Sequence, residues 1–286
     1  MDSSRQGLLS VHSAVFIFGL TALFSKLITL TALEITLLRS IFAVLALWMF
    51  IRWHKESIKL HSRSDYLIVI LLGLLLAAHW VTYFHAMQVS SVAVGVIALY
   101  TFPVITVFIE PFFHGERPHI KDIISALAVL FGISLLVPEF SLQDSTTQGV
   151  LWGVFSALLF ALRNIIQGRH FSSYPARHAL FYQAAITIVV LLPFGGASIP
   201  QVSNFQWGQL LLLGVVFTAL PHTLFAHSLL HFKAKTTSLI ACLQVVYATF
   251  FAAILLAEWP ELTTVLGGLI VVTAAMYESY TAGRKS

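Results

Sequence analysis

The chain has 286 residues, of which 58% are hydrophobic and only 10% are charged, and its formal net charge is +4. Soluble domains carry about 25% charged residues, so this composition excludes a soluble globular protein and indicates an integral membrane protein. The basic surplus is expected to mark orientation in the membrane rather than nucleic-acid binding. The single cysteine, Cys242, excludes an intramolecular disulfide.

Apolar segments long enough to cross a bilayer recur along the whole chain. A spanning helix needs about 20 mostly apolar residues, and the segments that meet this requirement are 8–29, 32–53, 65–87, 90–113, 120–138, 148–170, 177–195, 206–230, 235–257 and 261–281. The first lacks a clear small-x-small cleavage site, so we expect a span rather than a signal peptide. The sequence therefore predicts an all-α integral membrane protein with ten transmembrane helices and no soluble domain.

The basic residues outside the span centres fall on alternate connections. They lie before span one, between spans two and three, after span four, around the junction of spans six and seven, between spans eight and nine, and at the end of the chain. The opposite loops, such as "PEFSLQDSTTQG" and "GGASIPQVSNFQ", contain no Lys or Arg. Cytoplasmic loops collect Lys and Arg, so both termini are predicted to be cytoplasmic.

The stretches "HGERP" and "AEWPE" each end an apolar run with Glu-x-Pro, at Glu116 and Glu258. The two glutamates have the same place in the two halves of the chain. Five spans per half is an odd number, so the second half enters the membrane inverted, as in many secondary transporters. We predict two inverted five-helix repeats, 8–138 and 148–281. The alternative is that Glu-x-Pro is simply a good end for a span.

Several short motifs occur in the order seen in one known family. They are Leu38-Arg39 at the start of span two, Pro103 in span four, Gly115-Glu116 at its end, Gly149 at the start of span six, and Ala257-Glu258. Together they resemble the EamA-type transporters of the drug/metabolite transporter superfamily over essentially the whole chain. One departure is "LQVVYA", with Gln244 and Val245 where span nine of the family usually carries a proline.

The resemblance implies a small-molecule carrier of the bacterial inner membrane, often an exporter of amino acids or other metabolites. It also implies a central cavity lined mainly by spans one, three, four, six, eight and nine, with spans five and ten as scaffold. The sequence agrees with the scaffold role, because "SALAVLFG" and "LGGLIVVTAA" are rich in small residues that permit close helix contact.

Near the predicted midplane the polar residues are mostly aromatic or amide. Taken singly, each of these residues is best interpreted as a hydrogen-bonding group between helices. Taken as a set, they predict a pocket for a neutral or zwitterionic ligand with apolar parts. Two prolines beside the set are expected to loosen the backbone. The predicted substrate-binding residues are His79, Trp80, Tyr83, Tyr100, His222, Gln244, Tyr247 and Arg39, and the predicted gating or structural residues are Pro103, Glu110, Arg163 and Pro221.

Charged residues inside spans need a partner, a cavity or an interface, since each costs roughly 2.5–3.5 kcal/mol at the bilayer centre. Lys26, Glu34 and Arg39 are expected near the outer surface. Arg39 either forms a structural ion pair with Glu34 or binds a substrate carboxylate. Glu110 and Arg163 are expected near the cytoplasmic side, where they either pair to close an inner gate or reach the interface separately.

Sequence patterns of other function classes are missing. The chain has no Gly-x-Ser-x-Gly, no His-Glu-x-x-His and no cysteine pair, and its histidine pairs lack clustered acids or cysteines, so no catalytic residues, metal or cofactor are expected. We predict a secondary transporter that exports a small metabolite by alternating access. The alternatives are a membrane-embedded enzyme or a non-transporting sensor. Expected partners are the substrate and the bilayer, with no nucleic acid, in a monomer or weak homodimer.

Overall fold

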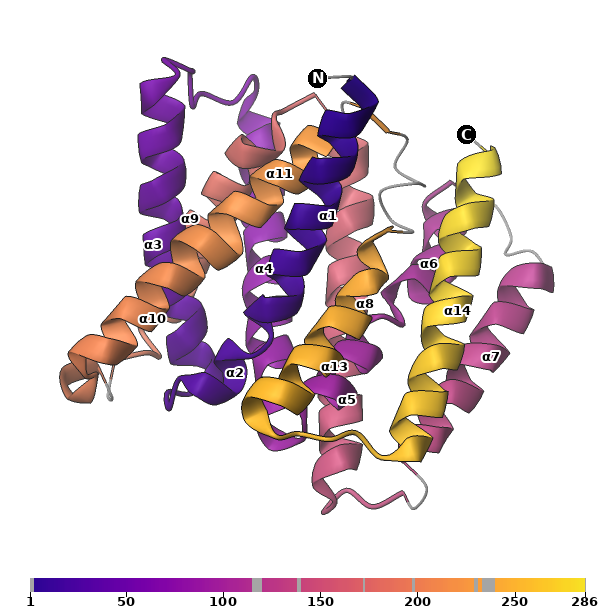
Figure 1. The fold of residues 1–286 in the computed structure, drawn as a ribbon. Coiled ribbons are helices and arrows are strands. Elements are labelled where there is room, and N and C mark those ends of the chain that lie inside the picture. Colours follow the sequence, from indigo (N-terminus) through magenta and orange to yellow (C-terminus); the bar gives the residue numbers. More distant parts are fainter. Residues whose placement is uncertain are drawn as a thin grey trace.

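The computed structural model describes residues 3–114, 120–137, 140–171, 173–196, 199–228, 231–232 and 240–285. Within these ranges every regular element is a helix and no strand occurs, which confirms the predicted all-α class. The helices run back and forth between two ends of one bundle, and both termini lie at the same end (Figure 1). We call this the termini end, and the other the opposite end.

The first half of the chain begins and breaks its helices where the sequence provides caps and turns. Thr31 and Ser62 each accept from the backbone of an acidic residue three positions later, in capping boxes, and Ser91 caps the next helix. The elements are α1 (Ser3–Thr21), α2 (Phe24–Leu27), α3 (Ala32–Trp53), α4 (Arg63–Val89), α5 (Val92–Leu99), α6 (Phe102–His114) and α7 (Ile120–Leu136).

The second half follows the same logic. Asp144 accepts from Thr147 N at 2.7 Å at the start of one helix, and Ser203 forms a capping box with Gln206 at the start of another. The elements are α8 (Ser145–His170), α9 (Ala176–Leu191), the 3₁₀ turn η1 (Ile199–Gln201), α10 (Asn204–Gly214), the π-helix η2 (Val215–Ala219), α11 (Leu220–Ser228), α13 (Leu243–Leu256) and α14 (Leu262–Lys285).

Six of the described helical segments are long and apolar enough to cross a membrane: Arg5–Leu27, Ala32–Trp53, Arg63–Val89, Val92–Pro111, Ser145–His170 and Asn204–Phe225. Shorter apolar helices at Ile123–Leu136, Ala176–Leu191, Leu243–Leu256 and Leu262–Tyr277 occupy the remaining predicted segments. The count of ten spans therefore stays a prediction, because these four fall below the spanning length.

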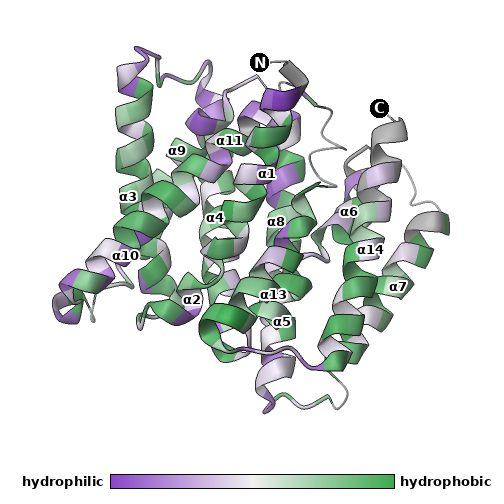
Figure 2. Ribbon diagram, viewed as in Figure 1, coloured by the Kyte–Doolittle hydropathy of each residue, from purple (hydrophilic) through white to green (hydrophobic). Residues whose placement is uncertain are grey.

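The surface of the bundle suits lipid. Large apolar side chains are exposed along the outward faces of the helices, for example Leu67 at 70%, Leu130 at 64% and Leu269 at 59%. Figure 2 shows hydrophobic residues along the helices and hydrophilic residues mostly near their ends. Apolar area of this extent is unfavourable in water and favourable against acyl chains.

The helix packing depends on small residues. Helices α7 and α14 pack against each other, and a Cβ added at Gly132 would lie 2.9 Å from the backbone oxygen of Gly267. The backbones therefore approach as closely as glycine allows. This confirms the close contact predicted for spans five and ten. Helix α4 packs on α8 and α9 in the middle of the bundle, where the predicted site residues lie.

Candidate substrate site

His79 joins α4 to α8 in the interior. Its Nδ1 lies 2.8 Å from Ser156 Oγ, and that hydroxyl donates to the carbonyl of His79 at 2.9 Å. Because the hydroxyl proton is used in the second bond, the imidazole donates from Nδ1 in the first. The ring of Phe160 stacks on the imidazole at 4.7 Å between centroids. His79 is thus held in one orientation by the second half of the chain.

Arg39 extends from α3 over two aromatic rings of α4. Its guanidinium carbon lies 3.9 Å from the centroid of Trp80 and 4.8 Å from that of Phe84, and the residue is only 3% exposed. Its Nε has no hydrogen-bond partner, and neither has the hydroxyl of Tyr83, one turn beyond Trp80. Glu34, the other predicted partner, accepts from the backbone N of Thr31 at 3.1 Å at the start of α3.

Tyr100 and Gln244 connect the two halves of the chain. The hydroxyl of Tyr100 lies 2.5 Å from the carbonyl oxygen of Ala241 and 3.1 Å from Gln244 Oε1. Gln244 Nε2 donates weakly to the carbonyl of Phe18 in α1, at 3.5 Å. Tyr83 lies close enough to Gln244 to interact with it. The predicted residues of spans three, four and nine therefore converge in the interior.

A π-helix precedes His222. Pro221 has no N–H to donate to the carbonyl of Phe217, and Thr21 Oγ1 from α1 donates to that oxygen instead, at 3.0 Å. His222 Nδ1 donates to Thr218 O at 2.7 Å, which leaves Nε2 without the proton in the neutral imidazole. Its ring lies 6.4 Å from that of Trp80 between centroids, so His222 borders the cluster around Arg39.

Tyr247 lies apart from this cluster. It lines a groove of about 390 Å³ between α1 and α13, together with His12, Ser13, Phe16 and Ile17, and its ring meets that of Phe16 edge-on at 5.6 Å. Gln244 and Tyr247 both lie against α1, but only Gln244 reaches the inner polar residues. The structure therefore does not bring Tyr247 together with the other predicted site residues.

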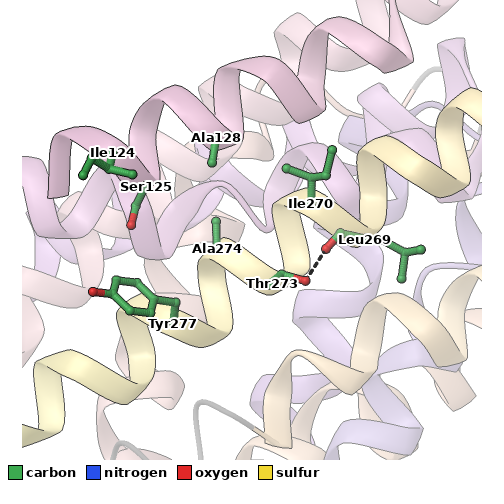
Figure 3. A pocket seen from close by; sticks show the side chains of 8 residues that line it. All are labelled: Ile124, Ser125, Ala128, Leu269, Ile270, Thr273, Ala274 and Tyr277. Atoms are coloured by element: carbon green, nitrogen blue, oxygen red, sulfur yellow. Dashed lines mark hydrogen bonds between the residues drawn. The ribbon is translucent and has the colours of Figure 1, made fainter. Parts of the chain in front are cut away.

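The larger groove lies between α7 and α14 (Figure 3), with a volume of about 480 Å³. Its lining is almost entirely apolar, and the one hydrogen bond drawn there runs within α14, from Thr273 Oγ1 to the carbonyl of Leu269 at 2.7 Å. Among the described residues that line the groove, none is charged and none is a predicted site residue. It belongs to the outer face of the two scaffold helices.

The structure does not form the Glu110–Arg163 ion pair, which was one of the two alternatives that the sequence left open. Glu110 is exposed on α6. Arg163 is buried and donates from Nε to Gln183 Oε1 at 2.7 Å and from Nη1 to Asn164 Oδ1 at 3.1 Å. Neutral amides therefore satisfy the guanidinium where the sequence suggested a carboxylate. The predicted kink at Pro103 matches a break, because α5 ends at Leu99 and α6 begins at Phe102.

Sequence reasoning missed a polar contact at the opposite end of the bundle. Lys26 Nζ donates to the carbonyl of Ser90 at 2.8 Å and lies 3.6 Å from Glu258 Oε1. The backbone N–H of Val92 donates to Glu258 Oε2 at 2.9 Å. We call this contact the opposite-end latch, because it ties α2, α5 and the segment after α13 together. The repeated Glu-x-Pro was its sequence signal, and Glu116, the counterpart of Glu258, lies outside the described residues.

A second polar contact, the termini-end clasp, joins the connection before α4 to the start of α9. Arg177 donates from Nε to Glu56 Oε2 at 2.8 Å and from Nη2 to Glu56 Oε1, and His178 Nε2 lies 3.0 Å from Glu56 Oε2. The hydrogen bond from Arg177 lowers the pKa of Glu56. From the sequence, Arg177 was interpreted only as an orientation signal. Among the described residues, no group of His, Cys, Asp and Glu is arranged to hold a metal.

Comparison with known proteins identifies a family and several relatives of this chain. The sequence profile of the EamA-like transporter family matches twice, over residues 5–137 and 147–279. Relatives include the uncharacterized transporter YxxF of Bacillus subtilis, 24% identical over 284 residues, covering 96% of this chain and 90% of the relative. The pseudopaline exporter CntI of Pseudomonas aeruginosa is 25% identical over 285 residues, covering 98% of each chain.

The S-adenosylmethionine uptake transporter of Rickettsia felis is 23% identical over 256 residues, covering 88% of this chain and 84% of the relative. A solved crystal structure, 16% identical, has a TM-score of 0.65 over 100% of this chain and 98% of that one, so the two share a fold. The matched family and these relatives are all described as transporters rather than enzymes. The chain is therefore a multi-pass membrane transporter that belongs to the EamA-like transporter family.

Proposed function

We propose that the protein is a secondary transporter that moves a small metabolite, an amino acid or a similar compound, across the bacterial inner membrane by alternating access. Export is the proposed direction, as in the relative named a pseudopaline exporter. The proposal makes the buried polar residues between the two halves the substrate site: Arg39, His79, Trp80, Tyr83, Tyr100, His222 and Gln244, with Tyr247 on the approach between α1 and α13.

One observation carries the proposal: two turns next to helices meet at this site. Between α5 and α6 the chain makes a turn at Tyr100 and Thr101, and before α13 it makes a turn at Cys242. The turns have equivalent places in the two matches of the family profile, and the hydroxyl of Tyr100 contacts the carbonyl of Ala241 beside the second turn. Discontinuous helices around a central site are the arrangement that secondary transporters use.

The proposed architecture is two inverted repeats, 8–138 and 148–281, and the double match of the family profile supports it. We place both termini in the cytoplasm, because the connection between α3 and α4 lies at the termini end and carries Lys55 and Lys59, with Arg52 and Arg63 at its borders. In this orientation the opposite-end latch closes the outer side. Transport then requires the latch to open while contacts form at the inner side.

The test is flux in liposomes after a ligand screen. Purified protein is screened for ligands by the shift in melting temperature, since a ligand that binds the native state stabilises it. A radiolabelled hit is then loaded into proteoliposomes, with and without a pH gradient. Saturable flux that protein-free liposomes lack supports the proposal. Binding without flux in either direction would instead favour a non-transporting sensor.

The matched control for this test is Gly208→Ala in α10. A Cβ at this position has nothing within 4 Å, so the variant is expected to fold and transport as the wild type does. His79→Ala removes the interior contact with Ser156 and is expected to weaken ligand affinity or flux. Equal flux for wild type and both variants would move the site elsewhere.

A further inference from the structure

Unpartnered polar atoms gather around Arg39. Among the described residues, six buried side-chain polar atoms have no hydrogen-bond partner, and three of them are Thr36 Oγ1, Arg39 Nε and Tyr83 Oη. Thr36 and Arg39 are three residues apart on α3 and so share a face. Tyr83 lies one turn beyond Trp80 on α4, and its ring lies 6.0 Å from that of Phe84, over which the Arg39 guanidinium also lies.

All three residues are enclosed. Thr36 is 0% exposed, Arg39 3% and Tyr83 6%. A buried polar group without a partner destabilises the folded state, and a buried charge does so more strongly. The stacking of the guanidinium on Trp80 recovers only part of that cost. A resting protein gains nothing from such an arrangement, whereas a ligand that supplies acceptors removes the penalty.

The local charge is positive. Arg163 is also buried and donates to two neutral amides, of Gln183 and Asn164, and both arginines act electrostatically on His79 and His222. The carboxylate of Glu34, on the same helix as Arg39, accepts from Thr31 N and Thr31 Oγ1 at 3.1 and 2.9 Å, where α3 begins. A site whose side chains offer hydrogen-bond donors and whose surroundings are positively charged favours the binding of an anion.

We propose that Thr36, Arg39 and Tyr83 form the subsite for a carboxylate of the transported metabolite. The inference rests on the proposed function and names its substrate class: small carboxylates, amino acids included, whose apolar part lies against Trp80 and Phe84. The guanidinium lies over the indole of Trp80, and its Nε has no hydrogen-bond partner. The fork of N–H groups on a guanidinium matches a planar carboxylate. A phosphate ester, with more charge, would need additional cationic or N-terminal helix donors.

The test uses matched ligands. Melting temperature and calorimetric affinity are measured with phenylalanine, its amide and phenethylamine, with short aliphatic carboxylates, and with inorganic phosphate. Carboxylates are expected to stabilise the wild type, and the amide, the amine and phosphate are not. Wild-type protein that no carboxylate on this panel stabilises, or that binds acid and amide equally, overturns the proposal.

Variants locate the subsite. Arg39→Lys is expected to lower carboxylate affinity by roughly tenfold to a hundredfold, as expected for losing a charged hydrogen bond, and Tyr83→Phe and Thr36→Val by less. Because Thr36→Val removes an unsatisfied hydroxyl, it should keep or raise the melting temperature of the ligand-free protein. Thr249→Val, which removes a buried unpartnered hydroxyl on α13, is the matched control and should leave the affinity unchanged.

The outcomes also separate this proposal from the transport function. If a substrate is transported without needing its carboxylate, and Arg39→Lys binds it with wild-type affinity, the transport function is supported and the carboxylate subsite is refuted. If carboxylates bind in a way that depends on Arg39 but no flux is found, the subsite is supported and the proposed transport function is refuted.

Discussion

The opposite-end latch gives the sharpest prediction about conformation. Lys26 Nζ and Glu258 Oε1 are 3.6 Å apart, and their side chains are 25% and 23% exposed. This ion pair therefore stabilises the closed opposite end by at most about 1 kcal/mol. The hydrogen bond from Val92 N to the Glu258 carboxylate, at 2.9 Å, contributes about 1.5–3 kcal/mol. Glu258→Ala is therefore expected to destabilise the closed opposite end by about 2–3 kcal/mol, or roughly 30- to 150-fold in the closed-to-open ratio.

The assay is the labelling rate of one buried cysteine. Cys242 is changed to alanine, and a cysteine replaces Ala22, a residue of 0% exposure one turn before Lys26. A membrane-impermeant maleimide is applied to the protein in lipid nanodiscs. Opening of the latch exposes the new thiol, so the rate in Glu258→Ala should rise in proportion to the open fraction.

Two controls define the result. Glu258→Gln keeps an acceptor for Val92 but loses the charge, so an intermediate rate is expected. Glu261→Gln makes the same change at an exposed neighbour and should leave the rate unchanged. If Glu258→Ala labels no faster than the wild type, the latch does not hold this end closed and the reasoning fails.

Three further predictions concern stability in detergent. The hydrogen bond from Arg177 lowers the pKa of Glu56, so the clasp contributes fully above the unfolded carboxyl pKa and is lost as the pH falls through the lower, folded one. The Tm of Glu56→Gln should therefore be lower than that of the wild type near neutral pH, and the two should converge in acid as the pH falls through the folded pKa. Gly267→Val should separate α7 from α14 and cost about 1–3 kcal/mol, measured by denaturation against Gly208→Ala. Ser156→Ala removes the hydroxyl that bonds His79 and leaves its imidazole only the longer contact with the carbonyl of Ser156, at 3.2 Å. This variant should cost about 1 kcal/mol, and an unchanged Tm would contradict the role given to the hydroxyl.

Much of the fold could be predicted because lipid imposes a simple rule on sequence. Apolar length placed the helices, and the prolines marked the interruptions at Pro103 and Pro221. The turn at Cys242 was not predicted, because it contains no proline, and the sequence departs there from the family pattern. Its position depends on contacts with α5 that are distant in the chain.

The candidate site was predictable in composition but not in pairing. Helical periodicity correctly placed His79 and Tyr83 on one face, with ring centroids 6.1 Å apart. Charge matching offered Glu110 as one possible partner of Arg163, whereas Gln183 of α9 provides the acceptor. A neutral amide gives no charge signal in a sequence, so this pairing could not be predicted. The stacking of Arg39 on Trp80 depends on the crossing of α3 and α4, which no local pattern encodes.

Substrate counterflow in proteoliposomes tests the central claim most directly. Vesicles are preloaded with an unlabelled carboxylate ligand, and uptake of the same compound in labelled form is followed from outside. Alternating access around one site predicts saturable uptake that the internal ligand accelerates and that Arg39→Lys weakens. Uptake that is linear in concentration and indifferent to internal ligand, or absent with a ligand that binds, would contradict the account.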